Sequence, residues 1–397
     1  MSERIIDKRL WEALPDDEKI NGIDSKPSKP YWLEVWHIFR KNGLAMLGLQ
    51  MTCFVVLFAC VGPLVTKHDY STQQLAFANV PPRFEIYKVS EESFIYMHND
   101  YKLFDVTRDG QLNHLLSEDT HNIVERTKTY EMEGKTIILD YAYAALKAEQ
   151  NPEGVKFKIR VDGAIISPYA KVHNRLNILG TDGLGRDLLA RLIYGAQISL
   201  VIAIVATLVN FIVGVLYGGI AGYFGGRVDN IMMRMVDTIS TIPLILYVIL
   251  LSVIIGTVQK AIIIAIGSVY WVNMARIVRG QILSLKEQDF ILSARTIGSS
   301  PTRILLRHLI PNAIGPIIVA LTMMIPSAIF TEAFLSFIGL GVRAPLASWG
   351  TLASDALGGL RSYPYQLFYP SLGISITVLA LNFLGDGLRD ALDPKLR

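Results

Sequence analysis

The chain has 397 residues, of which 51% are hydrophobic and only 18% are charged, and its mean hydropathy is +0.36. Soluble globular proteins carry about 25% charged residues, so this composition excludes an ordinary soluble enzyme and a disordered protein. The formal net charge of +3 is too small to indicate a nucleic acid as partner. The chain is therefore expected to be a polytopic membrane protein that lies in the lipid bilayer.

Six apolar stretches are long enough to cross a bilayer, which requires about 20 residues of helix. They are predicted at Leu44–Val65, Ile198–Tyr223, Met235–Ile255, Val258–Leu283, Pro311–Phe337 and Phe368–Leu388. In the second stretch, Gly214 and Gly218 have the small-xxx-small spacing that lets two helix backbones approach closely. The sequence thus predicts an all-α membrane domain of six packed helices.

The basic residues near the ends of these stretches indicate the orientation of the protein. Arg and Lys are concentrated before the first stretch, before the third, between the fourth and fifth, and after the last. Six crossings place all four segments on one side, which the positive-inside rule makes the cytosol. Both termini are then cytosolic, with residues 1–42 as an N-terminal tail and residues 43–66 as the first transmembrane helix.

The segment between the first and second stretches differs in composition from the rest of the chain. From Lys67 to Arg191 it holds 16 of the 38 Lys and Arg residues and 18 of the 35 Asp and Glu residues. Long loops cross the membrane largely regardless of their charge, so residues 67–176 are expected to be an extracytoplasmic insert.

Local patterns within this insert predict a folded domain. Alternating apolar and polar residues at 84–89 and 155–161 predict strands, and Asp162-Gly163 predicts a tight hairpin turn. Residues 140–150 suit a short helix. A small α+β domain within residues 70–168 is therefore expected in preference to a flexible linker, because aromatic residues recur along it.

A basic segment between the fourth and fifth stretches, residues 284–310, reads as two short helices with a break at Gly298–Pro301. Its apolar and basic residues alternate, so it presents an amphipathic surface on the cytosolic face. Taken alone, this pattern fits a docking helix for a partner protein and fits equally well a helix that lies on the membrane surface.

The same segment is similar to the EAA loop of ABC importer permeases. In that family E-A-A is followed after three residues by Gly, and after nine more positions the loop ends in the pattern I-x-L-P. The residues that stand at the matching positions here are Leu292, Ser293, Ala294, Gly298, Ile310 and Pro311. Leu292 replaces the Glu, so the resemblance implies a helix that docks an ATPase subunit without that acidic charge.

Further segments narrow the resemblance. Residues 179–187, with the sequence LGTDGLGRD, look like the signature of the C-type permease subunit of oligopeptide and dipeptide ABC importers. Residues 332–341 and 380–394 resemble the same subunit. On this basis the chain is identified as a member of that family of binding-protein-dependent inner-membrane components, although its insert is longer than the usual first external loop. Within the signature, an ion pair or helix cap is expected for Arg186 and Asp187, in preference to contact with the solute.

The resemblance implies the type I permease fold in a bacterial plasma (inner) membrane, with residues 177–397 as a five-helix permease core. It also implies three kinds of partner: a homologous second permease subunit, two cytosolic ATPase subunits that bind ATP and Mg, and an extracytoplasmic peptide-binding protein. Gly134-Lys135-Thr136 lacks the glycine five residues earlier that a P-loop needs. The chain itself is therefore expected to be no enzyme and to hold neither a cofactor nor a metal.

Four polar residues within the predicted stretches are candidates for the transport pathway or the helix interior. Ionisable residues inside a membrane normally face the bundle interior or a water-filled cavity, which makes Asp237 and Glu332 such candidates. A structural hydrogen bond or a position at the membrane boundary is the alternative for both. Asn210 and Asn382 are expected to form hydrogen bonds between helices.

Several functions stay open at this point. The same permease type carries other solutes, such as nickel or a glycoconjugate, and the shared backbone motifs do not separate them from peptides. A secondary transporter driven by an ion gradient would be expected to show inverted repeats and buried carboxylates, and the EAA spacing argues against it. A membrane sensor with an external ligand-binding domain is a third class.

Overall fold

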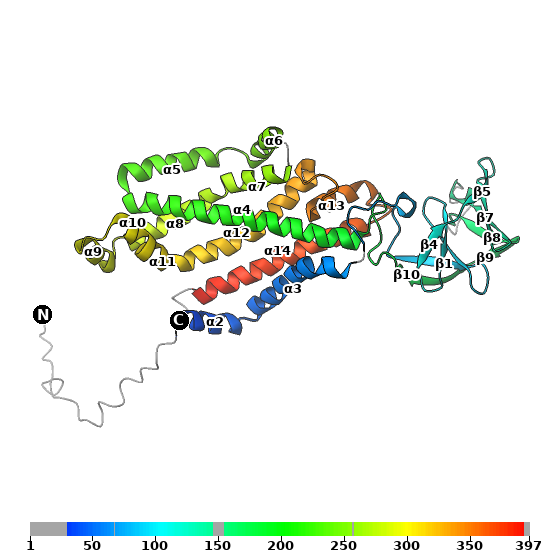
Figure 1. Ribbon diagram of the computed structural model, residues 1–397, viewed down its shortest axis with the longest axis horizontal. Helices are drawn as coiled ribbons and strands as arrows, with labels where there is room; N and C mark the ends of the chain where they lie inside the picture. The colour runs from blue at the N-terminus through cyan, green and yellow to red at the C-terminus, as the bar shows by residue number, and fades with distance from the viewer. Residues whose placement is uncertain (1–29, 67, 146–154, 256–257, 393–397) are drawn as a thin grey trace, which may run out of the picture.

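Long apolar stretches of the sequence form a bundle of helices, and the polar stretch between the first two forms a β insert at one end of it (Figure 1). The computed structural model describes residues 30–66, 68–145, 155–255 and 258–392. Among these residues, five helical segments are long and apolar enough to cross a membrane, and they coincide with five of the six predicted apolar stretches. They are α3 (Gly43–Val65), α4 (Leu188–Phe224), the pair α7 (Val258–Val269) and α8 (Trp271–Leu285), the pair α12 (Ile314–Leu335) and η5 (Ser336–Leu340), and α14 (Tyr365–Leu392).

The third predicted stretch, Met235–Ile255, is not one continuous helix. The chain forms α5 (Gly226–Ser240) and α6 (Leu244–Ile255), which together are apolar enough to cross a membrane but meet at a bend of 82°. Pro243 lies at the break, and a proline cannot donate the amide hydrogen bond that would continue the helix. The helix is therefore interrupted within this stretch.

Small residues let α4 lie directly against α8. An added Cβ at Gly214 would lie 2.6 Å from the Cβ of Met274, and one at Gly218 would lie 2.2 Å from the carbonyl oxygen of Ala275. Interiors are packed too densely to absorb such overlaps, so a larger residue at either position would push the two helices apart. The predicted small-xxx-small contact is confirmed.

The two ends of the bundle carry different elements (Figure 1). One end holds α2 (Tyr31–Lys41), α9 (Asp289–Thr296), α10 (Pro301–Ile304), the π-helical turn η4 (Leu305–Leu309) and α11 (Ile310–Asn312). The other end holds the insert together with α13 (Trp349–Ala356) and η6 (Leu357–Gly359). The 37-residue helix α4 runs between the two ends and is about 55 Å long, at about 1.5 Å per residue.

The described part of the insert contains ten strands in two antiparallel sheets. The first sheet has the order β10-β1-β2-β3-β4, and the second has the order β5-β6-β7-β8-β9. The strands of the first sheet are β1 (Arg83–Lys88), β2 (Phe94–Met97), β3 (Leu103–Val106), β4 (Leu112–Leu115) and β10 (Pro168–His173). Those of the second are β5 (Glu118–Asn122), β6 (Thr127–Met132), β7 (Lys135–Asp140), β8 (Lys158–Val161) and β9 (Ala164–Ile166).

The predicted α+β character of the insert is wrong for the described residues, which form strands and only two 3-10 turns, η2 (Leu75–Phe77) and η3 (Ala142–Ala145). The strand predicted at 84–89 is confirmed by β1. The strand predicted at 155–161 is confirmed by β8 over residues 158–161. Asp162 and Gly163 join β8 to β9 with φ values of +49° and +85°, as a tight hairpin turn requires. Of the short helix expected at 140–150, residues 146–150 lie outside the described residues.

Sheet packing explains why the insert needs no covering helix. One hydrophobic core lies between the two sheets and joins Tyr87 and Ile95 of the first to Ile137 of the second. Another core of the same domain joins Phe84 and Phe94 of the first sheet. The second sheet therefore takes the place that a helix layer would occupy in an α+β fold.

Candidate functional site

The EAA-like segment, residues 284–310, forms a helix–turn–helix at the end of the bundle opposite the insert (Figure 1). α9 ends in a Schellman motif: the amide of Gly298 donates to the carbonyl of Arg295 (2.9 Å), and the amide of Ser299 donates to that of Ala294 (3.1 Å). This ending needs a left-handed residue, and Gly298 supplies it with a φ of +85°. The predicted break between the two helices is confirmed.

Buried apolar residues hold the EAA-like segment to the bundle. Ile291, Ile304 and Leu309 are fully buried and form one cluster with residues of α4, α8 and α12. Ala294 and Ile310, two of the motif residues, are partly buried and pack against the same cluster. A movement of the segment is therefore tied mechanically to the long helices, because densely packed interiors transmit displacement.

The other motif residues face outward. Leu292 is 45% exposed, and Ser293 and Pro311 are also exposed. Further large apolar side chains of the segment are exposed as well, with Ile297 the most exposed at 84%. Exposed apolar side chains gathered on one short segment are typical of a surface that binds another protein.

The signature loop, residues 179–187, lies at the opposite end, where the insert meets the bundle. The Thr181 hydroxyl donates to the carbonyl of Phe77 (2.5 Å) and accepts from the amide of Val80 (2.8 Å). The Tyr365 hydroxyl donates to the carbonyl of Thr181 (3.0 Å). This one residue thus ties the start of the insert to α14.

Two glycines let the signature loop approach the insert backbone. Gly180 and Gly185 have φ values of +82° and +73°. An added Cβ would lie 2.6 Å from the carbonyl oxygen of Val80 in the first case and 1.8 Å from that of Gln74 in the second. Both the backbone conformation and the contact therefore require glycine.

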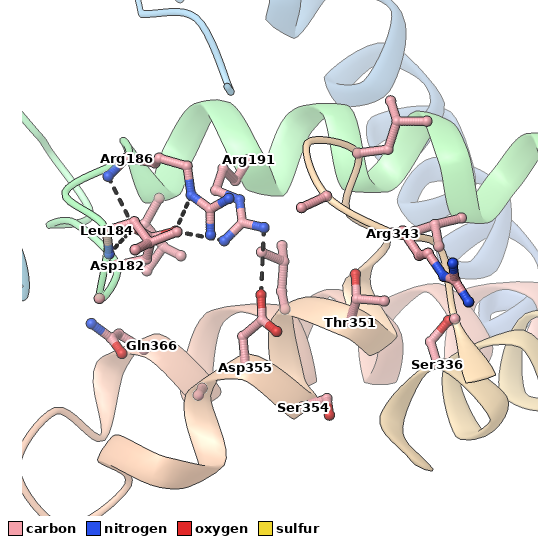
Figure 2. A pocket seen from close by; sticks show the side chains of 18 of the residues that line it. Asp182, Leu184, Arg186, Arg191, Ser336, Arg343, Thr351, Ser354, Asp355 and Gln366 are labelled. Carbon is pink, nitrogen blue, oxygen red and sulfur yellow. Dashed lines mark hydrogen bonds and ion pairs between the residues drawn. The ribbon is translucent and has the colours of Figure 1, made fainter. Parts of the chain in front are cut away.

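The charged residues of the signature are used inside the chain. Asp182 accepts from Nε of Arg186 (2.7 Å) and from Nη1 of Arg191 in α4 (2.6 Å), and none of the three is more than 7% exposed. Asp187 caps α4 by accepting from the amide of Ala190 (2.7 Å). The predicted ion pair and helix cap are therefore both confirmed, and Figure 2 shows the ion pair.

A cavity of about 560 Å³ opens beside this ion pair (Figure 2). Its polar lining includes Arg191, Arg343 and Asp355, which were not among the residues predicted from the sequence. The sequence could have identified Arg191 as a candidate, because an Arg at the start of a long apolar helix needs a charged partner or a water-filled space. Asp355 lies 3.5 Å from Nη2 of Arg191.

The four polar candidates lie on four different helices, and among the described residues no hydrogen bond or ion pair joins any two of them. Glu332 of α12 is fully buried and accepts from the hydroxyls of Ser199 (3.0 Å) and Ser336 (2.7 Å). Asp237 of α5 is exposed and pairs with Arg276 of α8 (2.8 Å).

The predicted hydrogen bonds between helices are absent for both asparagines among the described residues. Asn210 of α4 is 1% exposed, and neither its amide nitrogen nor its oxygen has a partner there. The contacts of α4 on either side are apolar: Ala203 clusters with Ala328, and Gly214 meets Met274. Asn382 of α14 is half-buried, and its side chain forms no hydrogen bond with a described residue.

In the part of the chain that the structure describes, no group of three or more His, Cys, Asp or Glu residues could hold a metal ion.

Comparison with known proteins identifies two family matches. The first, described as "Binding-protein-dependent transport system inner membrane component", covers residues 214–397. The second, described as "N-terminal TM domain of oligopeptide transport permease C", covers residues 30–82. The two matches lie on either side of most of the insert.

Curated relatives match over a greater length. The chain is 38% identical to the oligopeptide transport system permease protein OppC of Bacillus subtilis over 396 residues, 99% of both chains. It is 47% identical to the dipeptide transport system permease protein DppC of the same organism over 390 residues, 98% of this chain and 93% of the relative. The Escherichia coli OppC protein is 47% identical over 218 residues, 55% of this chain and 72% of the relative.

The two Bacillus relatives align through the region of the insert, so an insert of this length is not peculiar to this chain. Among solved structures, the inward-facing MetNI methionine ABC transporter is 21% identical over 51% of this chain and 96% of that one, with a TM-score of 0.44. The chain is a multi-pass permease component of an ABC transporter, and the ATPase lies in other subunits. It belongs to the family of binding-protein-dependent inner-membrane permeases, as a C-type permease of the oligopeptide and dipeptide transport systems.

Proposed function

We propose that this chain takes up oligopeptides or dipeptides as one of two homologous permease subunits of an ABC importer. The similarity over nearly the full length to a dipeptide permease (47%) and to an oligopeptide permease (38%) carries this proposal. Two cytosolic ATPase subunits bind ATP and Mg and drive the cycle. An extracytoplasmic binding protein delivers the peptide.

The arrangement of the bundle supports a definite orientation. The EAA-like segment and the insert lie at opposite ends of α4, whose length of about 55 Å exceeds the roughly 30 Å of a bilayer core. Outside the insert, most basic residues near the ends of the apolar stretches lie at the end with the EAA-like segment. That end is therefore the cytosolic one, both termini are cytosolic, and the insert (residues 67–176) is extracytoplasmic.

The EAA-like segment couples the ATPase to the bundle. Its exposed face, with Leu292, Ser293 and Ile297, receives an ATPase subunit, and its buried anchors Ile291 and Ile304 pass the movement to α8 and α12. ATP binding favours one state of the bundle through different affinities for its inward- and outward-open forms. Asp237, the exposed member of the four polar candidates, is the best placed to meet the partner permease or the pathway.

Transport by the complete complex tests the function. This chain would be reconstituted in liposomes with its partner permease, the ATPases and the binding protein, and uptake of a labelled dipeptide would be measured with and without ATP. Uptake that requires ATP and is not inhibited by nickel or a glycoconjugate is expected. Uptake driven by an ion gradient alone, or no uptake with every partner present, would contradict the proposal.

A substitution in the EAA-like segment tests the coupling role. Gly298→Val places a branched residue at a φ of +85°, where L residues are strained, and is expected to prevent co-purification of the ATPase. Gly280→Ala in α8 is the matched control, because its added Cβ meets nothing within 4 Å and its φ is not positive. Normal co-purification of the Gly298 variant would refute the coupling role.

The insert is proposed to help dock the binding protein. The turn between β5 and β6 carries Ile123 and Val124, which are 75% and 93% exposed at the end of the molecule far from the bundle. Replacing both with Ser is expected to weaken association of the binding protein and leave membrane insertion intact. If deletion of residues 70–168 changed neither association nor uptake, the insert would have no such role.

A further inference from the structure

The cavity beside the signature loop is formed by three separate parts of the chain. They are the signature loop with the start of α4, η5 with the loop that follows it, and α13; Gln366 of α14 adds one more lining side chain (Figure 2). Its volume of about 560 Å³ lies in the range of small-molecule sites, which is about 300–1,000 Å³. It opens at the insert end of the bundle, where a delivered substrate would first meet this chain.

The charges that line the cavity do not balance. Asp182 pairs with both Arg186 and Arg191, and Asp355 lies 3.5 Å from Arg191. Arg343 lines the cavity from the loop after η5 and forms no ion pair with any described residue. Three guanidinium groups therefore face two carboxylates, which leaves one positive charge in surplus.

The cavity is also rich in hydrogen-bond donors. A guanidinium carries five N–H donors, and Arg191 uses its two Nη atoms on Asp182 and Asp355. The side chain of Arg191 is only 2% exposed, and its Nε atom is buried without an acceptor among the described residues. A buried donor without a partner is costly, so the site is suited to a ligand that supplies acceptor oxygens.

We propose that this cavity binds a carboxylate, the C-terminal carboxylate of the transported peptide, with Arg343 as its charge partner. Asp182 holds Arg191 and Arg186 in place, so the wall is preorganised before the ligand arrives. An Arg guanidinium matches a carboxylate in geometry and can bind both of its oxygens. The inference rests on the proposed peptide transport and adds a recognition step within the permease.

Ligand binding by the permease complex without the binding protein tests the site. The complex of this chain with its partner permease and ATPases would be placed in lipid nanodiscs, and binding of the dipeptide Ala-Phe would be followed by saturation-transfer NMR. Competition by a second free-acid dipeptide is compared with competition by its C-terminal amide. We expect the amide to compete about tenfold less well, which corresponds to one charge-assisted contact.

Variants of Arg343 assign the contact. Arg343→Gln is expected to abolish the preference for the free acid, and Arg343→Lys, which keeps the charge, is expected to restore part of it. Arg361→Gln is the matched control, because Arg361 is exposed in the same segment between η5 and α14 but does not line the cavity. It should behave like the unmodified chain.

Three results would overturn the site: no saturable signal, equal competition by acid and amide, or an unchanged preference in Arg343→Gln. An acidic side chain of the binding protein is the other source of a carboxylate. If Arg343→Gln weakened binding-protein association and left the acid preference unchanged, the peptide would not be the ligand. A failure of the proposed transport function can be told apart from a failure of this site, because in that case the unmodified complex would show no ATP-driven uptake.

Discussion

The signature loop and the EAA-like segment both match family patterns, but they use their side chains in opposite ways. In the signature loop, Thr181, Asp182 and Arg186 are at most 7% exposed, and all are hydrogen-bonded within the chain. In the EAA-like segment, Leu292 and Ile297 are 45% and 84% exposed. The first motif specifies how the insert is joined to the bundle, whereas the second specifies a surface. Burial separates these two meanings, which a sequence pattern alone does not distinguish.

The largest effect is expected at the centre of the signature loop. Asp182→Asn removes the charge partner of both Arg186 and Arg191, and a buried pair that loses one member costs about 3–5 kcal/mol of stability. Thermal unfolding in detergent measures the loss. Asp355→Asn is the control, because that side chain is 59% exposed and its pair should be worth less than about 1 kcal/mol. Equal losses would show that the loop is not held together by Asp182.

Backbone conformation is expected to give the next largest effect. Gly185→Ala combines a left-handed φ of +73° with a contact of 1.8 Å to the carbonyl oxygen of Gln74, and should cost about 2–3 kcal/mol. Gly183→Ala in the same loop is the control, since its φ is not positive and its nearest neighbour would be Asn79 Oδ1 at 3.8 Å. The same unfolding measurement compares the two. A harmless Gly185→Ala would mean that the loop and the insert are not in contact.

A smaller, pH-dependent effect is expected at the insert side of the same junction. His98 is 2% exposed, its Nε2 bonds the carbonyl of Asn79 (3.2 Å), and its Nδ1 accepts from the amide of Asp100 (3.3 Å). Burial lowers the pKa of His98, so the ring is neutral in the folded chain. Below about pH 6.5 the unfolded chain binds a proton that the folded chain does not, which costs up to about 1.4 kcal/mol per pH unit.

Unfolding measured at pH 7.5 and pH 5.5 checks this prediction. Stability should fall as the pH drops from about 6.5 toward the lowered pKa of the folded state. His98→Gln keeps a polar side chain but cannot titrate, so the loss in this range should be smaller. An identical pH profile for the variant would assign the loss to other groups.

The smallest effect on stability is expected on the outer face of the EAA-like segment. Leu292→Ser changes a side chain that is 45% exposed, so stability should stay within about 0.5 kcal/mol while ATPase association falls. Its neighbour Ile291 is fully buried, and Ile291→Ser should reduce stability strongly. Thermal unfolding and co-purification together separate the two residues. If Leu292→Ser destabilised the chain and left ATPase binding intact, the EAA-like segment would be a packed motif like the signature loop and not a binding surface.

Local patterns in the sequence were sufficient for much of the architecture. Apolar length predicts α3, α4, α12 and α14, since a helix that crosses a membrane satisfies its backbone hydrogen bonds within itself. Gly298 and Pro301 predict the turn between two short helices, because both residues act on their own backbone. The family resemblance likewise rests on local sequence, as in the LGTDGLGRD motif.

Contacts between distant segments were decided by the tertiary structure alone. Asp182 and Asp355 meet at Arg191, and the first and second sheets cover each other, but no periodicity encodes either pairing. A third long-range contact is that of Arg279 in α8, which holds Asp229 of α5 with two hydrogen bonds of 2.5 Å. The sequence by itself determined which segments are long and apolar enough to cross the membrane and which motifs they carry, because those signals are local. Only the tertiary structure decided which charges share a cavity and which motif faces outward, because burial and charge pairing arise between residues far apart in the chain.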